Sequence, residues 1–201
     1  MSALWDNVQR SVLVREIDEV VNTLQNIARN FEVHAGNPEP IVAAARCIRE
    51  ALARKNKLLF CGNGGSAADS QHLAAEFMGR YLRERHPQPA IALTVDTSVL
   101  TAIANDYDFK SIFSRQVAGL GREGDVLVAL STSGRSENIL EALHTARQLG
   151  ITTIGLTGAS GGEMRGVCDI LICTPAERPD RVQELHIATG HILCDLVEAT
   201  L

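Results

Sequence analysis

Short apolar runs alternate with helix-length stretches between residues 57 and 173, and this alternation limits the possible folds more than any other feature. Each run is too short for a buried helix and ends in glycine, serine, threonine or charged residues. Strands separated by helices are typical of crossover units in a parallel sheet. We therefore predict an α/β fold, with three αβα layers around a five-stranded parallel sheet. The expected strands are 57–61, 89–95, 125–130, 152–156 and 169–173.

Apolar residues at helical spacing indicate the elements around these strands. A long amphipathic helix is expected over 3–31, then a break at 34–40 with two prolines, then a helix over 41–55. We expect residues 1–56 to form N-terminal helices and residues 57–201 to form the ligand-binding domain, the two making effectively one compact unit. Further helices are expected up to about 81, over 97–105 and 108–119, up to about 148, and from about 178 to the end.

The composition argues against several functional classes. A formal net charge of -5 gives no support to a nucleic-acid partner, and 45% hydrophobic residues suffice for a folded core. The first ten residues lack an apolar signal segment, and no apolar stretch approaches about 18 residues. We therefore expect a cytoplasmic protein without a membrane span. The five cysteines show no C-x-x-C spacing, which favours reduced thiols over a thiolate zinc site.

A glycine-rich loop, Gly62-Asn63-Gly64-Gly65-Ser66-Ala67, follows the first expected strand. Ligands bind beyond the carboxyl ends of parallel strands, and glycines let the backbone approach them closely. Ser66 is expected to cap the next helix, whose N-terminus favours an anion or polar hydroxyls. The loop also fits the relaxed dinucleotide fingerprint G-x-G-x-x-A. However, Asp96, the acidic residue expected after the next strand, lies too far along the chain to favour that alternative.

A second loop, Ser131-Thr132-Ser133-Gly134-Arg135-Ser136, follows the third expected strand. Its four hydroxyl groups and the N-terminus of the following helix can bind a phosphate without a lysine. The alternative is an ordinary strand-to-helix turn capped by serine. The density of hydroxyl groups favours the phosphate site.

Acid–base and metal-binding residues occur on two expected helices. His72 and Glu76 lie one turn apart, so they share a face and could be metal ligands, although a surface ion pair is the commoner reason for such spacing. Gln183 and His191 lie eight positions apart on the last helix and face roughly the same way. His186 competes with His191 for the histidine role, and periodicity does not distinguish them.

Four segments together resemble a known family. They match, in order, the signature regions of the phosphoheptose isomerases, members of the sugar isomerase (SIS) domain superfamily that act on sedoheptulose 7-phosphate. The resemblance covers nearly the whole chain, including the N-terminal helices. The segments are CGNGGSAADSQHLAAEFMGRY, TAIANDYDF, STSGRS and RVQELHIATGHIL.

The resemblance implies a role for individual residues. Glu76 would be the catalytic carboxylate and His191 its acid–base partner, so the resemblance selects His191 over His186. Arg135 replaces an asparagine of the family's phosphate loop, a minor departure that bears on the precise sugar. The implied zinc ligands are His72, Glu76, Gln183 and His191, and the implied substrate-binding residues are Asn63, Gly64, Gly65, Ser66, Glu76, Asn105, Asp106, Ser131, Thr132, Ser133, Ser136 and Gln183.

The resemblance also implies an activity and an assembly. The expected reaction converts D-sedoheptulose 7-phosphate to D-glycero-D-manno-heptose 7-phosphate through an enediol, for heptose precursors of lipopolysaccharide core, capsule or another glycan. The expected assembly is a homotetramer with N-terminal helices packed between subunits. One alternative is a related non-catalytic adaptor that binds the replication initiator; its members lack the carboxylate and histidine present here. The other is a different SIS-type sugar-phosphate enzyme.

Overall fold

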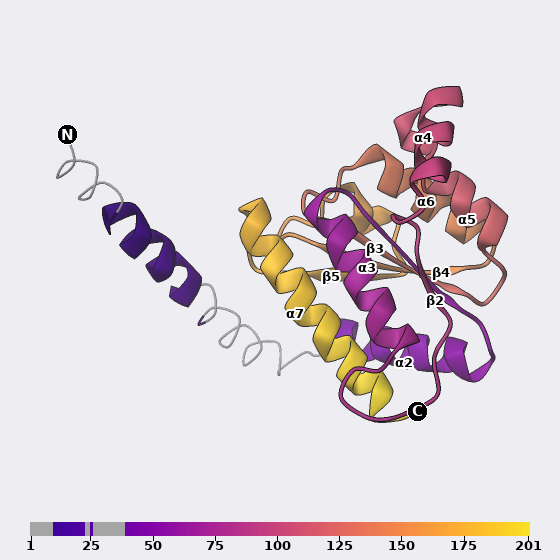
Figure 1. Cartoon of the computed structure of the whole chain (residues 1–201), viewed down its shortest axis with the longest axis horizontal. Helices are drawn as coiled ribbons and strands as arrows, with labels where there is room; N and C mark the ends of the chain where they lie inside the picture. The colour runs from indigo at the N-terminus through magenta and orange to yellow at the C-terminus, as the bar shows by residue number, and fades with distance from the viewer. Residues whose placement is uncertain (1–9, 23–24, 26–38) are drawn as a thin grey trace. The chain divides into compact units, whose positions relative to one another are not determined.

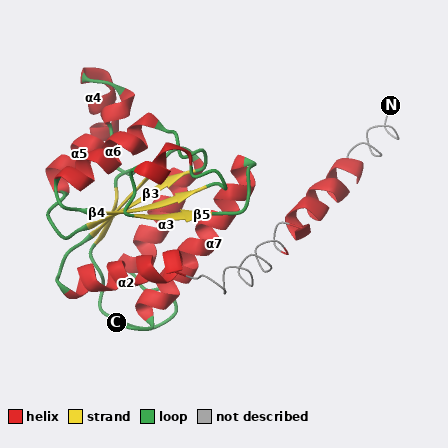
Figure 2. Cartoon of the chain, turned by 180° about the vertical axis from the view of Figure 1, so that it is seen from behind, coloured by secondary structure: helices red, strands yellow, loops and turns green. Residues whose placement is uncertain are grey.

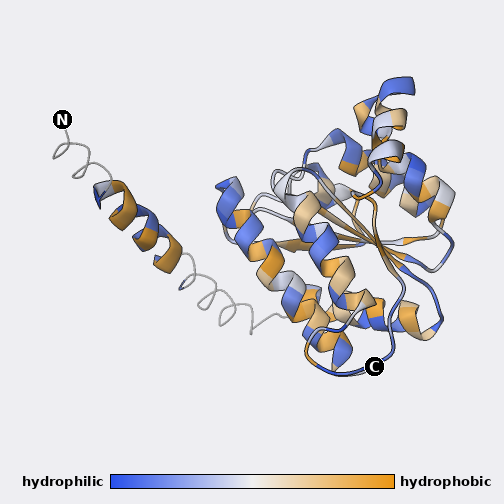
Figure 3. Cartoon of the chain, viewed as in Figure 1, coloured by the Kyte–Doolittle hydropathy of each residue, from blue (hydrophilic) through white to orange (hydrophobic). Residues whose placement is uncertain are grey.

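The computed structural model describes residues 10–22, 25 and 39–201. Residues 10–22 are helical, as predicted, and the rest of the helix expected over 3–31 lies outside the described residues, apart from the helical residue 25. Six large apolar side chains of this helix are exposed on its surface: Val12, Leu13, Val14, Ile17, Val20 and Val21. Figure 3 shows apolar and polar residues on different sides of the helix. No helix in the described part of the chain combines the length and hydropathy that crossing a bilayer requires.

All five predicted strands are present and form one parallel sheet. They are β1 (Leu58–Gly62), β2 (Ala90–Ala92), β3 (Val126–Ser131), β4 (Thr152–Thr157) and β5 (Ile170–Cys173), in the order β2-β1-β3-β4-β5. The edge strand β2 is shorter than the predicted run of 89–95. The chain turns away after Leu93, whose N–H still donates to the carbonyl of Phe60 at 2.9 Å.

Helices cover both faces of this sheet (Figures 1 and 2). On one side lie α2 (Glu39–Ala53), α3 (Gly65–Met78) and α7 (Pro179–Glu198). On the other lie α5 (Ser114–Leu120) and α6 (Glu137–Gln148), with α4 (Thr97–Asp106) at their margin. Two 3-10 turns, η1 (Phe109–Ser111) and η2 (Gly162–Gly166), complete the elements. The three-layer αβα prediction is confirmed.

Each strand supplies side chains alternately to two apolar cores. Leu58 and Phe60 of β1 pack under α2, α3 and α7, whereas Leu59 and Cys61 pack under α5 and α6. Successive side chains of a strand point to opposite faces, so a strand covered on both sides is apolar throughout. This is why the strands appear as continuous apolar runs in the sequence. Figure 3 shows the same apolar layer between more mixed helices.

Two predicted helices differ in their bounds. The helix expected to reach about 81 ends at Met78, where the N–H of Gly79 donates to the carbonyl of Ala75 at 2.8 Å. The stretch 108–119 is divided into η1 and α5. Asp108 caps the first piece by accepting from the N–H of Ser111, and the buried Ile112 and Phe113 separate it from the second.

Residues 39–201 form one compact unit. We expected the ligand-binding domain to begin at 57, after two N-terminal helices. That boundary stays a prediction. Helix α2, which precedes it, packs against α7 and β5 within this unit, because its buried face contributes Ala44, Ile48 and Leu52 to the core.

The sheet order defines where a ligand can bind. The connection from β1 leads to β2 on one side, whereas β3, β4 and β5 extend on the other, so the order reverses between β1 and β3. In open parallel sheets the crevice at such a reversal, beyond the carboxyl ends of the strands, is the usual ligand site. Both loops singled out in the sequence, 62–67 and 131–136, begin at the ends of these two strands.

Candidate active site

Two histidines and a carboxylate from α3 and α7 converge at one place. The Nε2 atoms of His72 and His191 lie 2.8 Å apart, and His72 Nε2 lies 3.4 Å from Glu76 Oε1. Their potential ligand atoms all fall within 4.8 Å of one another. His72 and Glu76 share a face because they are one helical turn apart. We name these three residues the His–Glu–His cluster.

Helices α3 and α7 run side by side in the same direction, which brings His191 to this cluster. Gly65 at the start of α3 lies against Gln183 near the start of α7, and Leu73 lies against Gly190 further along. A β-carbon at Gly190 would come within 2.5 Å of Leu73 Cδ2, so glycine allows the close approach there. His191 is the next residue and faces His72.

The cluster fits a metal ion. Donors held about 2.0–2.1 Å from a tetrahedral zinc are about 3.3 Å apart, close to the two separations found here. Imidazole nitrogen and carboxylate oxygen are also typical zinc donors. These three residues are the possible metal ligands that the described part of the chain brings together.

Gln183, the fourth expected ligand, lies at the first turn of α3. A β-carbon on Gly65 would overlap its side-chain amide, and the amide is near enough to Asp69 to influence the pKa of that carboxyl. Burial raises the pKa of Asp69, while the neighbouring His72 and the polar amide of Gln183 oppose that increase. Asp69 Oδ2 is buried without a hydrogen-bond partner among the described protein atoms. Sequence reasoning missed Asp69, although it lies one turn before His72 on the same face of α3.

Gly64 determines where the first loop ends and helix α3 begins. Gly64 has φ +57°, which L side chains rarely adopt, and it occupies the position before the first residue of α3. The prediction that Ser66 caps this helix is wrong: the helix has already begun at Gly65, and the Ser66 side chain is buried inside its first turn.

Asn138 joins the two loops and was missed by the sequence analysis. Its amide and that of Asn63 donate to each other's oxygen, both at 2.8 Å. Asn138 is buried within the apolar face of α6. A polar residue in an otherwise apolar helical stripe is the signal that could have identified it.

The second loop is held in a defined conformation by its own polar groups. Ser131 Oγ lies 3.1 Å from Ser136 Oγ, and Ser133 Oγ accepts from the Arg135 N–H at 3.2 Å. The carbonyl of Gly134 accepts from the N–H groups of Glu163 and Met164. Ser136 precedes α6 without a side-chain cap bond. The Arg135 side chain is exposed.

Asn105 and Asp106 lie at the end of α4, where both are exposed. Asn105 Nδ2 donates a hydrogen bond to Asp106 Oδ1 at 2.9 Å. Asp96, weighed above as a nucleotide ligand, caps α4 by accepting from the N–H of Val99.

His186 is fully buried on α7, away from the cluster to which His191 belongs. Burial lowers its pKa to about 4, and the nearby Thr157 backbone opposes that shift. Neither ring nitrogen has a hydrogen-bond partner among the described residues. The two histidines that periodicity could not separate therefore occupy different environments.

Comparison with known proteins decides the family. A family model described as the SIS domain matches residues 21–158. The phosphoheptose isomerase of Rhodospirillum rubrum is 54% identical over 185 residues, covering 92% of this chain and 98% of that protein. That of Nitratidesulfovibrio vulgaris is 58% identical over 163 residues, covering 81% of this chain and 78% of the relative. This chain belongs to the phosphoheptose isomerase family.

The solved structures agree with this assignment. The phosphoheptose isomerase of Neisseria gonorrhoeae has a TM-score of 0.85 at 40% identity, with 94% of this chain and all of that chain (100%) covered. The phosphoheptose isomerase family membership confirms the resemblance that the four motifs indicated. The roles assigned to individual residues stay predictions, to which the structure adds their arrangement.

Proposed function

We propose that this phosphoheptose isomerase interconverts D-sedoheptulose 7-phosphate and D-glycero-D-manno-heptose 7-phosphate through an enediol. The observation that carries the proposal is the placement of Glu76 and His191 in one cluster, next to loops suited to a phosphorylated sugar. Ketose-to-aldose conversion moves a proton between C1 and C2. It therefore needs a base at carbon and an acid at the carbonyl oxygen.

Glu76 is the base in this proposal, taking the proton from C1 and returning it at C2. His191 transfers protons at the oxygens. A positioned acid or base each contributes about 100- to 10,000-fold in rate. His72, Glu76 and His191, with Gln183 as the fourth ligand, would hold zinc, which when bound would stabilise negative charge developing on the sugar oxygens. Coordination would lower the basicity of Glu76, so its roles as metal ligand and as base would compete.

The phosphate is proposed to bind at Ser131, Thr132, Ser133 and Ser136, over the N-terminus of α6. Backbone N–H groups and the helix dipole favour an anion there. Asn63, Gly64, Gly65 and Ser66 would contact the sugar hydroxyls, with Asn105 and Asp106 from α4. Binding energy from the phosphate is remote from the reacting carbons and can be used to orient them.

A homotetramer is the proposed assembly. The exposed apolar side chains on the helix of residues 10–22 support it, since such a stripe is normally covered. The product is proposed to serve as a heptose precursor for a glycan. The cytoplasmic location expected from the sequence stays a prediction.

The test is conversion of sedoheptulose 7-phosphate by the purified protein, first with zinc and then with a chelator. Aldoheptose 7-phosphate should form with zinc and stop forming when the metal is removed. Glu76→Gln should abolish turnover, whereas Glu84→Gln, which changes a carboxylate whose side chain is 91% exposed, should not. A folded, metal-loaded protein that leaves the sugar unchanged would favour the adaptor or another sugar phosphate.

A further inference from the structure

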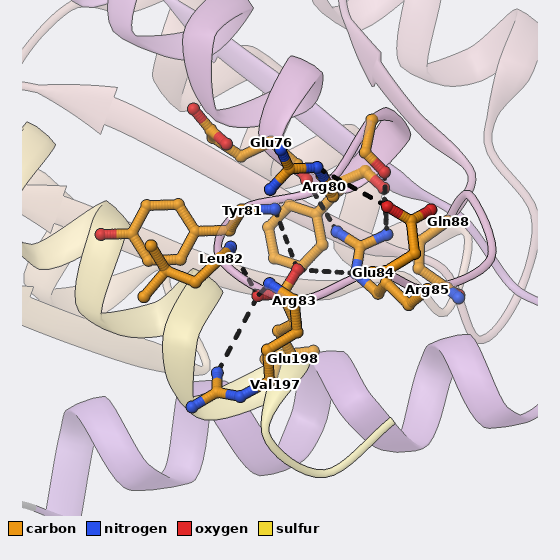
Figure 4. A network of polar contacts seen from close by, with 12 residues as sticks. Glu76, Arg80, Tyr81, Leu82, Arg83, Glu84, Arg85, Gln88, Val197 and Glu198 are labelled. Atoms are coloured by element: carbon orange, nitrogen blue, oxygen red, sulfur yellow. Dashed lines mark hydrogen bonds and ion pairs between the residues drawn. The ribbon is translucent and has the colours of Figure 1, made fainter.

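The buried carboxylate of Glu198, near the end of α7, holds the loop that follows α3 (Figure 4). Its Oε1 accepts from the N–H of Tyr81 at 2.9 Å, and its Oε2 accepts from those of Leu82 and Arg83, both at 2.7 Å. Three successive backbone N–H groups turned toward one anion form a nest, an arrangement usually found around bound anions. Here the anion belongs to the protein itself, so the nest fixes residues 81–83 against α7.

Arg85 completes this network and ties it to α3. Its Nε donates to Glu198 Oε1 at 3.1 Å, and Nη2 donates to the backbone carbonyl of Glu76 at 2.7 Å. Nη1 donates to the carbonyls of Phe77, Gly79 and His86. The last carbonyls of a helix lack helical partners and favour a cation. Arg85 thus stabilises the helix end that carries Glu76.

Tyr81 packs against the apolar core, but the residues that follow it in the loop have little apolar packing. Leu82 is 61% exposed, and Arg83 and Glu84 are exposed as well. Burial would raise the pKa of Glu198, but the three backbone N–H groups and Arg85 together hold it below its usual range. The carboxylate is therefore ionised at neutral pH, which is the state that the nest requires.

Fixing residues 81–83 places the Tyr81 ring on His191. The two ring centroids are 5.4 Å apart with an interplanar angle of 19°, a stacked arrangement. His72 meets the His191 ring at 71°, with centroids 5.1 Å apart. His191 is thus covered on one face by Tyr81 and contacted by His72, with its Nε2 directed to the cluster.

We propose that Glu198 and Tyr81 are positioning residues for the His–Glu–His cluster. Glu198 holds Tyr81 through the nest of residues 81–83, and the Tyr81 ring limits the orientation of the His191 imidazole. Through Arg85, Glu198 also steadies the turn of α3 that bears Glu76. This inference rests on the proposed role of the cluster in metal binding and isomerisation, and it assigns no contact with substrate to Glu198 or Tyr81.

Glu198→Gln tests the first step, with Asp125→Asn as its matched control. Asp125 is also buried and also accepts from backbone N–H groups, those of Lys57 and Arg122, and from a cation, Lys57. In either variant the new NH₂ group faces N–H donors and disrupts the network. The control network lies at the start of β1 and β3 and does not contact α3 or α7 through any described polar bond.

Co²⁺ binding to the metal-free full-length protein, followed by its visible absorption, is the first readout, because it needs no sugar. Positioning partners outside the ligand set typically affect metal affinity or activity by about 10- to 100-fold. We expect Glu198→Gln to weaken Co²⁺ binding and reduce kcat by about 10-fold or more, with KM little changed, whereas Asp125→Asn changes neither. Equal losses in both variants, or no Co²⁺ binding by the unaltered protein, would overturn the proposal.

Tyr81 variants keep the proposal testable if Glu198→Gln does not fold. Tyr81→Phe retains the stacked ring and should keep the Co²⁺ affinity and spectrum. Tyr81→Leu retains apolar volume without a ring and should lower the affinity about 10-fold. A Tyr81→Leu protein that binds Co²⁺ and turns over like the unaltered one would exclude positioning by Tyr81. If the variants change Co²⁺ affinity as predicted but the unaltered protein shows no isomerase activity, the proposed function is refuted and the positioning roles of Glu198 and Tyr81 are not.

Discussion

Asp125 and Glu198 are two buried carboxylates held in nearly the same way, yet they organise different parts of the molecule. Each side chain is 1% exposed, and each accepts backbone N–H groups together with a cation, Lys57 or Arg85. Asp125 joins residues that precede β1 and β3, so it fixes the N-terminal ends of two interior strands of the sheet. Glu198 joins a loop to two helices that carry the candidate active site. The same local chemistry thus serves the scaffold in one place and the site in the other.

The Glu76 carboxylate differs from those of Asp125 and Glu198 because it belongs to neither hydrogen-bond network. Its described side-chain contact is with His72, and 20% of it is exposed. Glu76→Gln should reduce kcat by about 100- to 10,000-fold, since the base is lost, while the unfolding free energy stays close to that of the unaltered protein. Steady-state kinetics and urea unfolding measure the two effects. A Glu76→Gln protein with unaltered turnover would refute its role as base.

Removal of either buried carboxylate should destabilise the protein to a similar extent. Asp125→Ala and Glu198→Ala each leave a cation and several N–H groups without their partner, at a cost of about 3–5 kcal/mol. Urea unfolding of both variants at neutral pH checks this. If one variant were as stable as the unaltered protein, the two networks would not be equivalent in energy, and the comparison would fail.

The pH dependence of the unfolding free energy should distinguish these two carboxylates from the buried His186. The pKa of both carboxylates is lowered on folding, because hydrogen bonds and cations outweigh the effect of burial. Their contribution is present above the pKa of the unfolded state and is lost as pH falls through the folded pKa. His186 has a folded pKa of about 4, so the unfolded state takes up a proton first as pH falls from about 6.5.

The unfolding free energy should therefore decrease between about pH 6.5 and pH 4 by about 3 kcal/mol because of His186. His186→Gln should remove this part of the pH dependence and leave the later, carboxylate-dependent loss. Urea unfolding at a series of pH values gives the measurement. An unchanged profile in the variant would mean that His186 is accessible to protons in the folded state.

The smallest effect is expected for Arg83→Ala. The Arg83 side chain pairs with Asp195 at 2.6 Å, but both side chains are about half exposed, and such pairs contribute little in water. Its backbone N–H, which donates to Glu198, is retained in alanine. Neither stability nor Co²⁺ binding should change measurably. Arg83 Nη1 also lies 3.9 Å from Glu198 Oε2, and a clear loss of Co²⁺ affinity would show that this long ion pair contributes to the Glu198 network.

The sheet was predictable from the sequence because each strand is covered on both faces. Complete burial requires an apolar residue at nearly every position, and that requirement appears directly as runs such as 125–130. The helix spacing placed His72 and Glu76 on one face for an equally local reason. The Ser66 cap failed because the exact first residue of α3 depends on the conformation of Gly64, which the order of residues alone does not specify.

Relations between segments distant in the sequence were decided by the tertiary structure. His186 and His191 share one helix, and only the packing of α7 against α3 buries the first and brings the second to His72. Asn63 and Asn138 are 75 positions apart, and Tyr81 and Glu198 are 117 apart. The sequence by itself thus determined the elements and the family motifs, because burial and helical spacing are local patterns. Which side chains meet was determined by packing, because long-range contacts depend on how several elements are oriented at once.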